Sequence, residues 1–242
     1  MTDRTHVALD AIVPTFADVL HAQGMPSDMV VRDKIRDLVE ASLGIFFSEA
    51  HPCCITSDVS RSEFDDVFRG EGRNDGEAPL KTIYPQAEHL VLFALTMGHE
   101  LSKRIEACFK SNDFALGSML DTVASLAVEN SVGLLESRTA KRITGKETPT
   151  SSGVVLNYSP GYCGWHISAQ NKIFRYLHPE QIGITLSDSY LMTPLKSATG
   201  VLVHGDKAIH QFDIGFSFCR ACKDKTCLER KGRLASVNGS TL

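Results

Sequence analysis

The sequence predicts an α+β fold, because segments with helical periodicity come before segments with the pattern of strands. Residues 5–50 and 113–142 repeat apolar side chains at the spacing of a helix. Residues 208–218 alternate apolar side chains with small or polar ones, as a half-buried strand does. The chain has 242 residues, of which 43% are hydrophobic, so it can form one large domain or one domain with an added subdomain.

Three parts are expected along the chain. Residues 1–84 form a helical region and a loop, and the turn-forming run at 69–76 shows no apolar periodicity. Residues 85–218 hold the expected strands and the longest expected helix. Residues 219–242 form a tail that contains cysteines.

The second part begins with an apolar run at His89–Thr96, which fits a buried strand. A long helix follows, with Asn112 or Asp113 as its cap and an end near residue 142. One face of this helix is apolar, and another face carries Ser118, Thr122, Ser125, Glu129 and Glu136. Three shorter elements complete the prediction, namely a helix at 167–177 and strands at 196–204 and 208–218.

The charge of the chain excludes some classes of partner. The formal net charge is −4, and there is no run of five basic residues. Nucleic-acid binding and a polybasic membrane patch are therefore not expected. The first residues lack the apolar core of a signal peptide, and no run reaches the ~18 apolar residues of a membrane span. We expect a cytoplasmic protein.

Three cysteines near the end of the chain, Cys219, Cys222 and Cys227, have the spacing of a metal site. Two thiolates separated by two residues can chelate one ion, and a third at this distance can join them. The spacing suits zinc or an iron–sulfur cluster, each of which normally takes four ligands. The candidates for the fourth ligand are, in order, Cys163, then Cys53 or Cys54, then His166. Alternatively, the three cysteines are reduced thiols that hold no metal.

A second candidate site is the run at 159–166, which reads Ser-Pro-Gly-Tyr-Cys-Gly-Trp-His. Its two glycines would let the backbone approach a flat ligand closely. Tyr162 and Trp165 could stack on a ring while their polar tips form hydrogen bonds. The alternative is a buried turn with aromatic packing.

Several segments together resemble the activation domain of cobalamin-dependent methionine synthase. The long helix matches at Asp113–Asp121 and Ala127–Glu129, and Ser159–Tyr162 resembles the R-x-x-x-G-Y loop of that family. The segment Leu186–Gly200 resembles the one that follows this loop. The cysteine tail resembles the stand-alone branch of the family, which occurs with corrinoid methyltransferases. The resemblance implies a twisted antiparallel sheet with long helices.

The resemblance also implies a chemistry. The family domain caps a corrinoid and binds S-adenosylmethionine while a flavodoxin or ferredoxin supplies a low-potential electron. The electron reduces inactive cob(II)alamin, and the sulfonium methyl group traps the product. Carried over to this chain, Glu129 matches the acidic residue that meets S-adenosylmethionine. Ser159, Gly161 and Tyr162 match the binding loop.

One position departs from the family motif, because Asn157 stands where the motif has an arginine. Asparagine cannot form the charged, bidentate pair that arginine forms with a carboxylate. Losing such a contact costs about 1.5–3 kcal/mol, which puts S-adenosylmethionine binding in doubt. Arg138 or Arg142 would have to compensate.

The sequence therefore favours a reductive reactivation factor, or accessory subunit, for a corrinoid methyltransferase, with cobalamin on a partner or at the interface. A second hypothesis is a non-enzymatic cap or assembly module whose S-adenosylmethionine site is degenerate. A third is a zinc-stabilised structural protein. Whether the chain is itself an enzyme is left open by the sequence.

Overall fold

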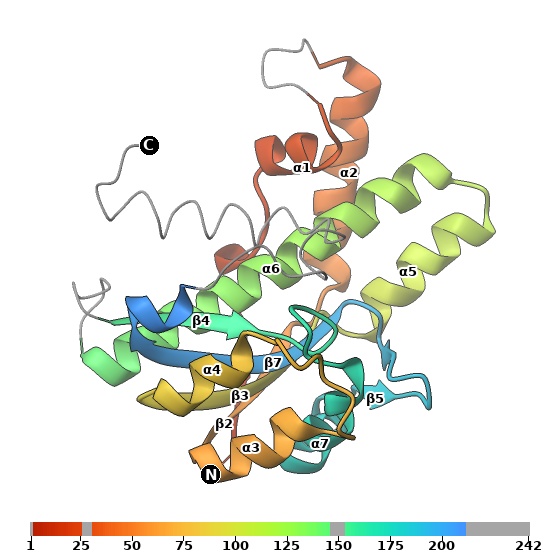
Figure 1. Ribbon diagram of the computed structural model, residues 1–242. Coiled ribbons are helices and arrows are strands. Elements are labelled where there is room, and N and C mark those ends of the chain that lie inside the picture. Colours follow the sequence, from red (N-terminus) through yellow and green to blue (C-terminus); the bar gives the residue numbers. More distant parts are fainter. Residues whose placement is uncertain (1, 26–30, 146–152, 212–242) are drawn as a thin grey trace.

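A computed structural model of the protein describes residues 2–25, 31–145 and 153–211. Its centre is an antiparallel sheet of five strands with the order β1-β2-β3-β7-β4 (Figure 1). The strands are β1 (Thr2–His6), β2 (Cys53–Val59), β3 (His89–Thr96), β7 (Ser197–Asp206) and β4 (Gly153–Tyr158). The central strands β3 and β7 pair from His89↔His204 to Thr96↔Ser197. β4 and β1 are the two edges of the sheet.

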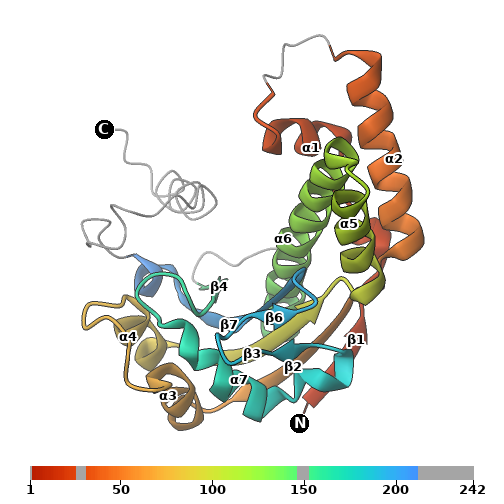
Figure 2. The ribbon, with the colours of Figure 1, turned by 90° about the vertical axis from the view of Figure 1, so that its right-hand side faces the viewer.

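Helices cover both faces of this sheet (Figure 2). One face carries α1 (Phe16–Ala22), α2 (Asp33–Glu49), α5 (His99–Lys110) and the 31-residue α6 (Phe114–Thr144). The other face carries α3 (Arg61–Arg69), α4 (Leu80–Ile83), η3 (Ile167–Ala169), α7 (Gln170–Leu177) and η4 (Pro179–Ile182). Three short elements complete the fold, η1 (Leu9–Ala11), η2 (Tyr84–Gln86) and η5 (Lys207–His210). The β5–β6 hairpin, residues 185–193, pairs β5 (Thr185–Leu186) with β6 (Met192–Thr193).

The apolar run at 89–96 is explained by burial on both faces of the sheet. Leu90, Leu92 and Ala94 pack into the core beneath α3 and α7, because alternate side chains of a strand point the same way. Val91, Phe93 and Leu95 pack into the core beneath α2 and α6. A strand covered on both faces shows no polar alternation.

The predicted α+β class is confirmed, and so is the antiparallel sheet. The strand at 89–96, the long helix, the helix at 167–177 and the strand near 196–204 all form. The expected strand at 208–218 is wrong at its start, because Lys207–His210 form a 3-10 turn. The side chain of Asp206 caps this turn by accepting a hydrogen bond from the amide of Ala208. The remainder of that segment lies outside the described residues.

Three strands of the central sheet, β1, β2 and β4, were not predicted from the sequence, and neither were the two short strands of the β5–β6 hairpin. β1 and β2 come from the first 84 residues, where helices and a loop were expected, and β2 pairs with β3 along its whole length. The predicted domain boundary at residue 84 stays a prediction. Strands from both sides of this boundary belong to the same sheet. None of the helices in the described part of the chain has the length and apolar character needed to cross a membrane.

Candidate functional site

The run at 159–166, called the 159–166 loop below, forms a tight turn directly after the edge strand β4. The amide of Gly161 donates to the carbonyl of Trp165 at 2.7 Å, and the amide of Trp165 donates to Tyr162 at 2.9 Å. Gly161 has φ +92° and Cys163 has φ +49°, which are left-handed backbone conformations. The turn is thus closed by its own backbone.

Aromatic packing anchors the loop in the core. Trp165 is only 2% exposed, and its ring lies 5.8 Å from that of Phe64 and 6.2 Å from that of Phe68, both on α3. This arrangement corresponds to the alternative of a buried aromatic turn. Stacking of Trp165 on a ligand stays a prediction, and it would require the loop to open.

A second segment, residues 70–76, holds the same loop from outside. Asn74 accepts a hydrogen bond from the amide of His166 at 2.9 Å and donates to the carbonyl of Phe68 at 2.5 Å. The amide of Asp75 donates to the carbonyl of Gly164 at 2.9 Å. The 70–76 loop also reaches the β5–β6 hairpin, because the hydroxyl of Tyr190 donates to Glu71 at 2.9 Å. The 70–76 loop therefore links the 159–166 loop to the β5–β6 hairpin.

Large apolar side chains are exposed on these segments. Tyr162 on the 159–166 loop is 55% exposed, Leu191 on the hairpin is 57% exposed, and Leu195, between the hairpin and β7, is 70% exposed. The phenol of Tyr162 is thus accessible on a loop that is otherwise fixed by Trp165 and Asn74. Such side chains can bury apolar area when another surface covers them.

The polar face of α6 is tied to the rest of the molecule at two points. Near its first half, Lys196 lies 2.8 Å from a carboxylate oxygen of Asp121 and donates to Ser125 at 2.8 Å. The Lys196 side chain is only 12% exposed, so its charge is compensated by Asp121 in a partly buried position. This contact fixes the segment between the hairpin and β7 against α6.

The second point joins α6 to the edge strand β4. Both the backbone amide and the side-chain amide of Asn157 donate to one carboxylate oxygen of Glu136, each at 2.7 Å. β4 is an edge strand, so a backbone amide pointing outward needs a partner from outside the sheet. Glu136 supplies that partner. Glu129, which is exposed, lies two helical turns earlier on the same face of α6.

The two arginines that could compensate for Asn157 lie elsewhere. Arg142 forms a bidentate pair with Asp58 on β2, at 2.7 and 3.0 Å. Arg138 lies close enough to Cys54 on β2 to favour its thiolate, although burial outweighs this and raises the pKa of Cys54 to about 11. β2 is separated from β4 by β3 and β7.

Only some of the cysteines predicted to bind metal lie in the part of the chain that the structure describes. Cys219, Cys222 and Cys227 lie outside the described residues. Cys163 is half-buried in the 159–166 loop, while Cys53 and Cys54 are buried in β2 and face opposite cores. The raised pKa of Cys54 disfavours the thiolate that a metal needs. Within residues 2–25, 31–145 and 153–211, no three histidine, cysteine or acidic side chains are placed to hold an ion.

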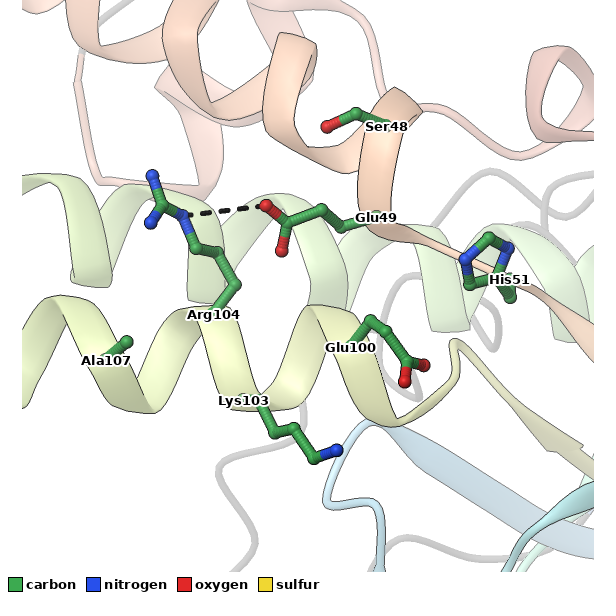
Figure 3. Close-up of a pocket in the computed structure, with 7 residues that line it drawn as sticks. All are labelled: Ser48, Glu49, His51, Glu100, Lys103, Arg104 and Ala107. Atoms are coloured by element: carbon green, nitrogen blue, oxygen red, sulfur yellow. Dashed lines mark ion pairs between the residues drawn. The ribbon is translucent and has the colours of Figure 1, made fainter.

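A cavity of about 400 Å³ lies away from these segments, between the end of α2 and the start of α5 (Figure 3). Its side chains carry both charges, and Arg104 lies 3.7 Å from Glu49 across it. It is lined by Ser48, Glu49, His51, Glu100, Lys103, Arg104 and Ala107, none of which the sequence analysis proposed. We take the 159–166 loop, the hairpin and the polar face of α6 as the candidate site, because these are segments in which the sequence resembles the family's activation domain.

Sequence reasoning placed Glu136 on the polar face of the long helix but gave it no role. Its signal was the seven-residue spacing from Glu129, which puts both on one side of a helix. Asn74, Glu71 and Lys196 were not singled out either. Their roles depend on contacts between segments far apart in the chain, which no local pattern reveals.

This architecture, a five-stranded antiparallel sheet with helices on both faces, occurs in a protein domain of known structure. The crystal structure of the MetH reactivation domain bound to AdoHcy superimposes with a TM-score of 0.64 and 16% sequence identity. The match covers 96% of this chain and 86% of that one. At this identity the likeness shows the shared fold.

The family follows from the sequence itself. Residues 81–224 match the model of the vitamin B12 dependent methionine synthase activation domain, and the chain belongs to that family. No curated protein sequence gives a significant match.

Proposed function

We propose that this protein is a reactivation factor, or accessory subunit, of a corrinoid-dependent methyltransferase. The observation that carries the proposal is the family match across residues 81–224, which includes the 159–166 loop and the hairpin. The protein would act in the cytoplasm on cobalamin that is held by a partner protein. It would cap the corrinoid and support either reduction of cob(II)alamin to cob(I)alamin or its remethylation.

Exposed apolar side chains near the 159–166 loop support a role in covering a partner-bound corrinoid. The cofactor supplies the redox and methyl-transfer chemistry, while the protein binds, orients and excludes water. Tyr162 and Leu191 are exposed on the two segments that the 70–76 loop connects, and Leu195 is exposed between the hairpin and β7. Covering them with a partner would remove apolar area from water and stabilise the complex.

The electron would come from a ferredoxin or a flavodoxin, or through a metal centre of this chain. The spacing of Cys219, Cys222 and Cys227 supports an iron–sulfur cluster, with Cys163 as the candidate fourth ligand. Iron analysis and the visible spectrum after anaerobic purification test this. Colourless, iron-free protein with seven titratable thiols would exclude the cluster. Bound zinc whose removal unfolds the tail without affecting reduction would favour a structural role.

The central experiment is a reduction assay with a purified corrinoid protein from the same cell, first identified by pull-down. The wild-type protein should raise the rate at which a low-potential reductant converts the partner's cob(II)alamin, as followed in the visible spectrum. Tyr162→Ala should weaken this effect. Phe47→Ala removes an exposed aromatic ring on α2, away from the site, and serves as the matched control. Binding without any acceleration would instead support the non-enzymatic cap.

A further inference from the structure

The side chain of Glu71 connects segments that lie far apart in the sequence. One of its carboxylate oxygens accepts a hydrogen bond from the hydroxyl of Tyr190, in the β5–β6 hairpin, at 2.9 Å. The other oxygen accepts a hydrogen bond from the side-chain amide of Asn171, near the start of α7, at 3.1 Å. The guanidinium of Arg73 lies 3.9 Å from the oxygen that Tyr190 contacts. One carboxylate thus ties the hairpin and α7 to the 70–76 loop.

The hairpin turn depends on support from outside, because Tyr190 adopts an unfavourable backbone conformation. Its φ is +63°, in the left-handed region that residues with a Cβ atom rarely adopt. Two backbone hydrogen bonds of 2.9 Å close the turn, from the amide of Tyr190 to Ser187 and from the amide of Ser187 to Leu191. The two strands of the hairpin have two residues each. A hairpin this short is at best marginally stable by itself, so the contact with Glu71 should contribute to its order.

The 70–76 loop, on the other side of this contact, is anchored at both of its ends. A Cβ atom on Gly70 would lie 3.2 Å from the Cα atom of Ala169, so the loop begins directly against η3. Further along, Asn74 donates to the carbonyl of Phe68 and accepts from the amide of His166. Glu71 lies between these two anchors, and its carboxylate is therefore presented from a fixed backbone.

We infer that Glu71 is a positioning residue that sets where the β5–β6 hairpin lies relative to the 159–166 loop. Leu191, next to Tyr190, and Tyr162, on the 159–166 loop, are both exposed. Because both segments are bonded to the 70–76 loop, this one loop fixes the spacing of the two side chains. Under the proposed function, on which this inference rests, a partner-bound corrinoid docks against that spacing. Glu71 acts through the hairpin, without contact to the cofactor.

Amide hydrogen exchange of the full-length protein tests the contact without any partner. Mass spectrometry follows the peptides that cover residues 185–195. Glu71→Ala and Tyr190→Phe should each speed exchange in the hairpin by about three- to tenfold. The double variant should be no more than about twofold faster than the faster single variant, because both changes remove the same hydrogen bond. Glu77→Ala, which removes an exposed carboxylate directly after the 70–76 loop, is the matched control.

A conservative substitution and the reduction assay distinguish positioning from a general loss of structure. Glu71→Gln keeps an oxygen that accepts from Tyr190, and its amide group can donate to the side-chain oxygen of Asn171. Its hairpin should exchange within about twofold of wild type. In the corrinoid reduction assay, Glu71→Ala should raise the half-saturating partner concentration by about fivefold and leave the maximal rate within about twofold. Glu71→Gln should restore most of this loss.

Three results would overturn the inference. The first is hairpin exchange at the wild-type rate in Glu71→Ala. The second is a double variant in which the effects of Glu71→Ala and Tyr190→Phe multiply, since the two side chains would then act separately. The third is a lower maximal rate of reduction in Glu71→Ala at saturating partner. A failure of the proposed function looks different, because the wild-type protein then gives no acceleration while the exchange rates still report on the Glu71 contact.

Discussion

The 159–166 loop and the β5–β6 hairpin both contact the 70–76 loop, but they are held in different ways. The 159–166 loop is fixed by a buried indole, by backbone hydrogen bonds and by Asn74. The hairpin has strands of only two residues, and its contact with Glu71 comes from one tyrosine hydroxyl. Their difference indicates a preorganised loop beside a more adaptable apolar surface, so substitutions in the two segments should act on different properties.

The largest effect on folding is expected from Trp165→Ala. Removing a buried tryptophan leaves a cavity between α3 and the loop and should cost about 3–5 kcal/mol of unfolding free energy. Chemical denaturation followed by far-ultraviolet circular dichroism measures this. Phe109→Ala, which removes a ring that is 41% exposed, should cost far less. Equal losses in the two variants would contradict the anchoring role of Trp165.

A smaller loss of stability is expected from a substitution at Gly200, where β7 lies against the start of the 159–166 loop. A Cβ atom at Gly200 would lie 2.9 Å from both the ring of Phe93 and the hydroxyl of Ser159, and it would collide with the carbonyl of Tyr158. Gly200→Ala should therefore destabilise the protein by about 1–3 kcal/mol. Gly44→Ala, in α2 with open space around it, should be neutral or stabilising. A neutral Gly200→Ala would show that the loop shifts freely.

The outer support of the loop can be tested separately. Asn74→Ala leaves the amide of His166 and the carbonyl of Phe68 without this partner, at a cost of about 1–2 kcal/mol. Asn74→Asp keeps an acceptor for His166 and should recover part of that loss. Thermal unfolding of the three proteins side by side gives the comparison. An aspartate variant no more stable than the alanine variant would argue against the hydrogen bond from His166.

The hairpin should show the opposite behaviour. Leu191→Ser in the hairpin and Leu195→Ser directly after it change exposed side chains, so the unfolding free energy should stay within about 0.5 kcal/mol of wild type. Affinity for the corrinoid partner should fall by about tenfold, since each leucine would lose its burial in the complex. Surface plasmon resonance with the purified partner measures this. Unchanged affinity in both variants would show that the partner does not dock on the hairpin or on the segment directly after it.

Long periodic segments were predictable from the sequence, and short strands were not. The polar and apolar faces of α6 follow from its 31 residues, and β3 follows from an unbroken apolar run. β2 and β4 are short and mix polar with apolar residues, so their pairing with β3 and β7 decides their conformation. The opposite error occurred at residues 208–210, where alternation predicted the start of a strand. Instead, the Asp206 side chain caps a 3-10 turn at residues 207–210.

The sequence by itself determined the family, the long helix with its acidic face and the turn at 159–166. The tertiary structure decided what those residues touch. It placed Trp165 in the core, directed Arg138 and Arg142 towards β2, and put Glu136 against Asn157. The physical reason is that helical periodicity fixes which side of α6 a residue occupies, whereas the sheet order fixes which strand lies opposite that side.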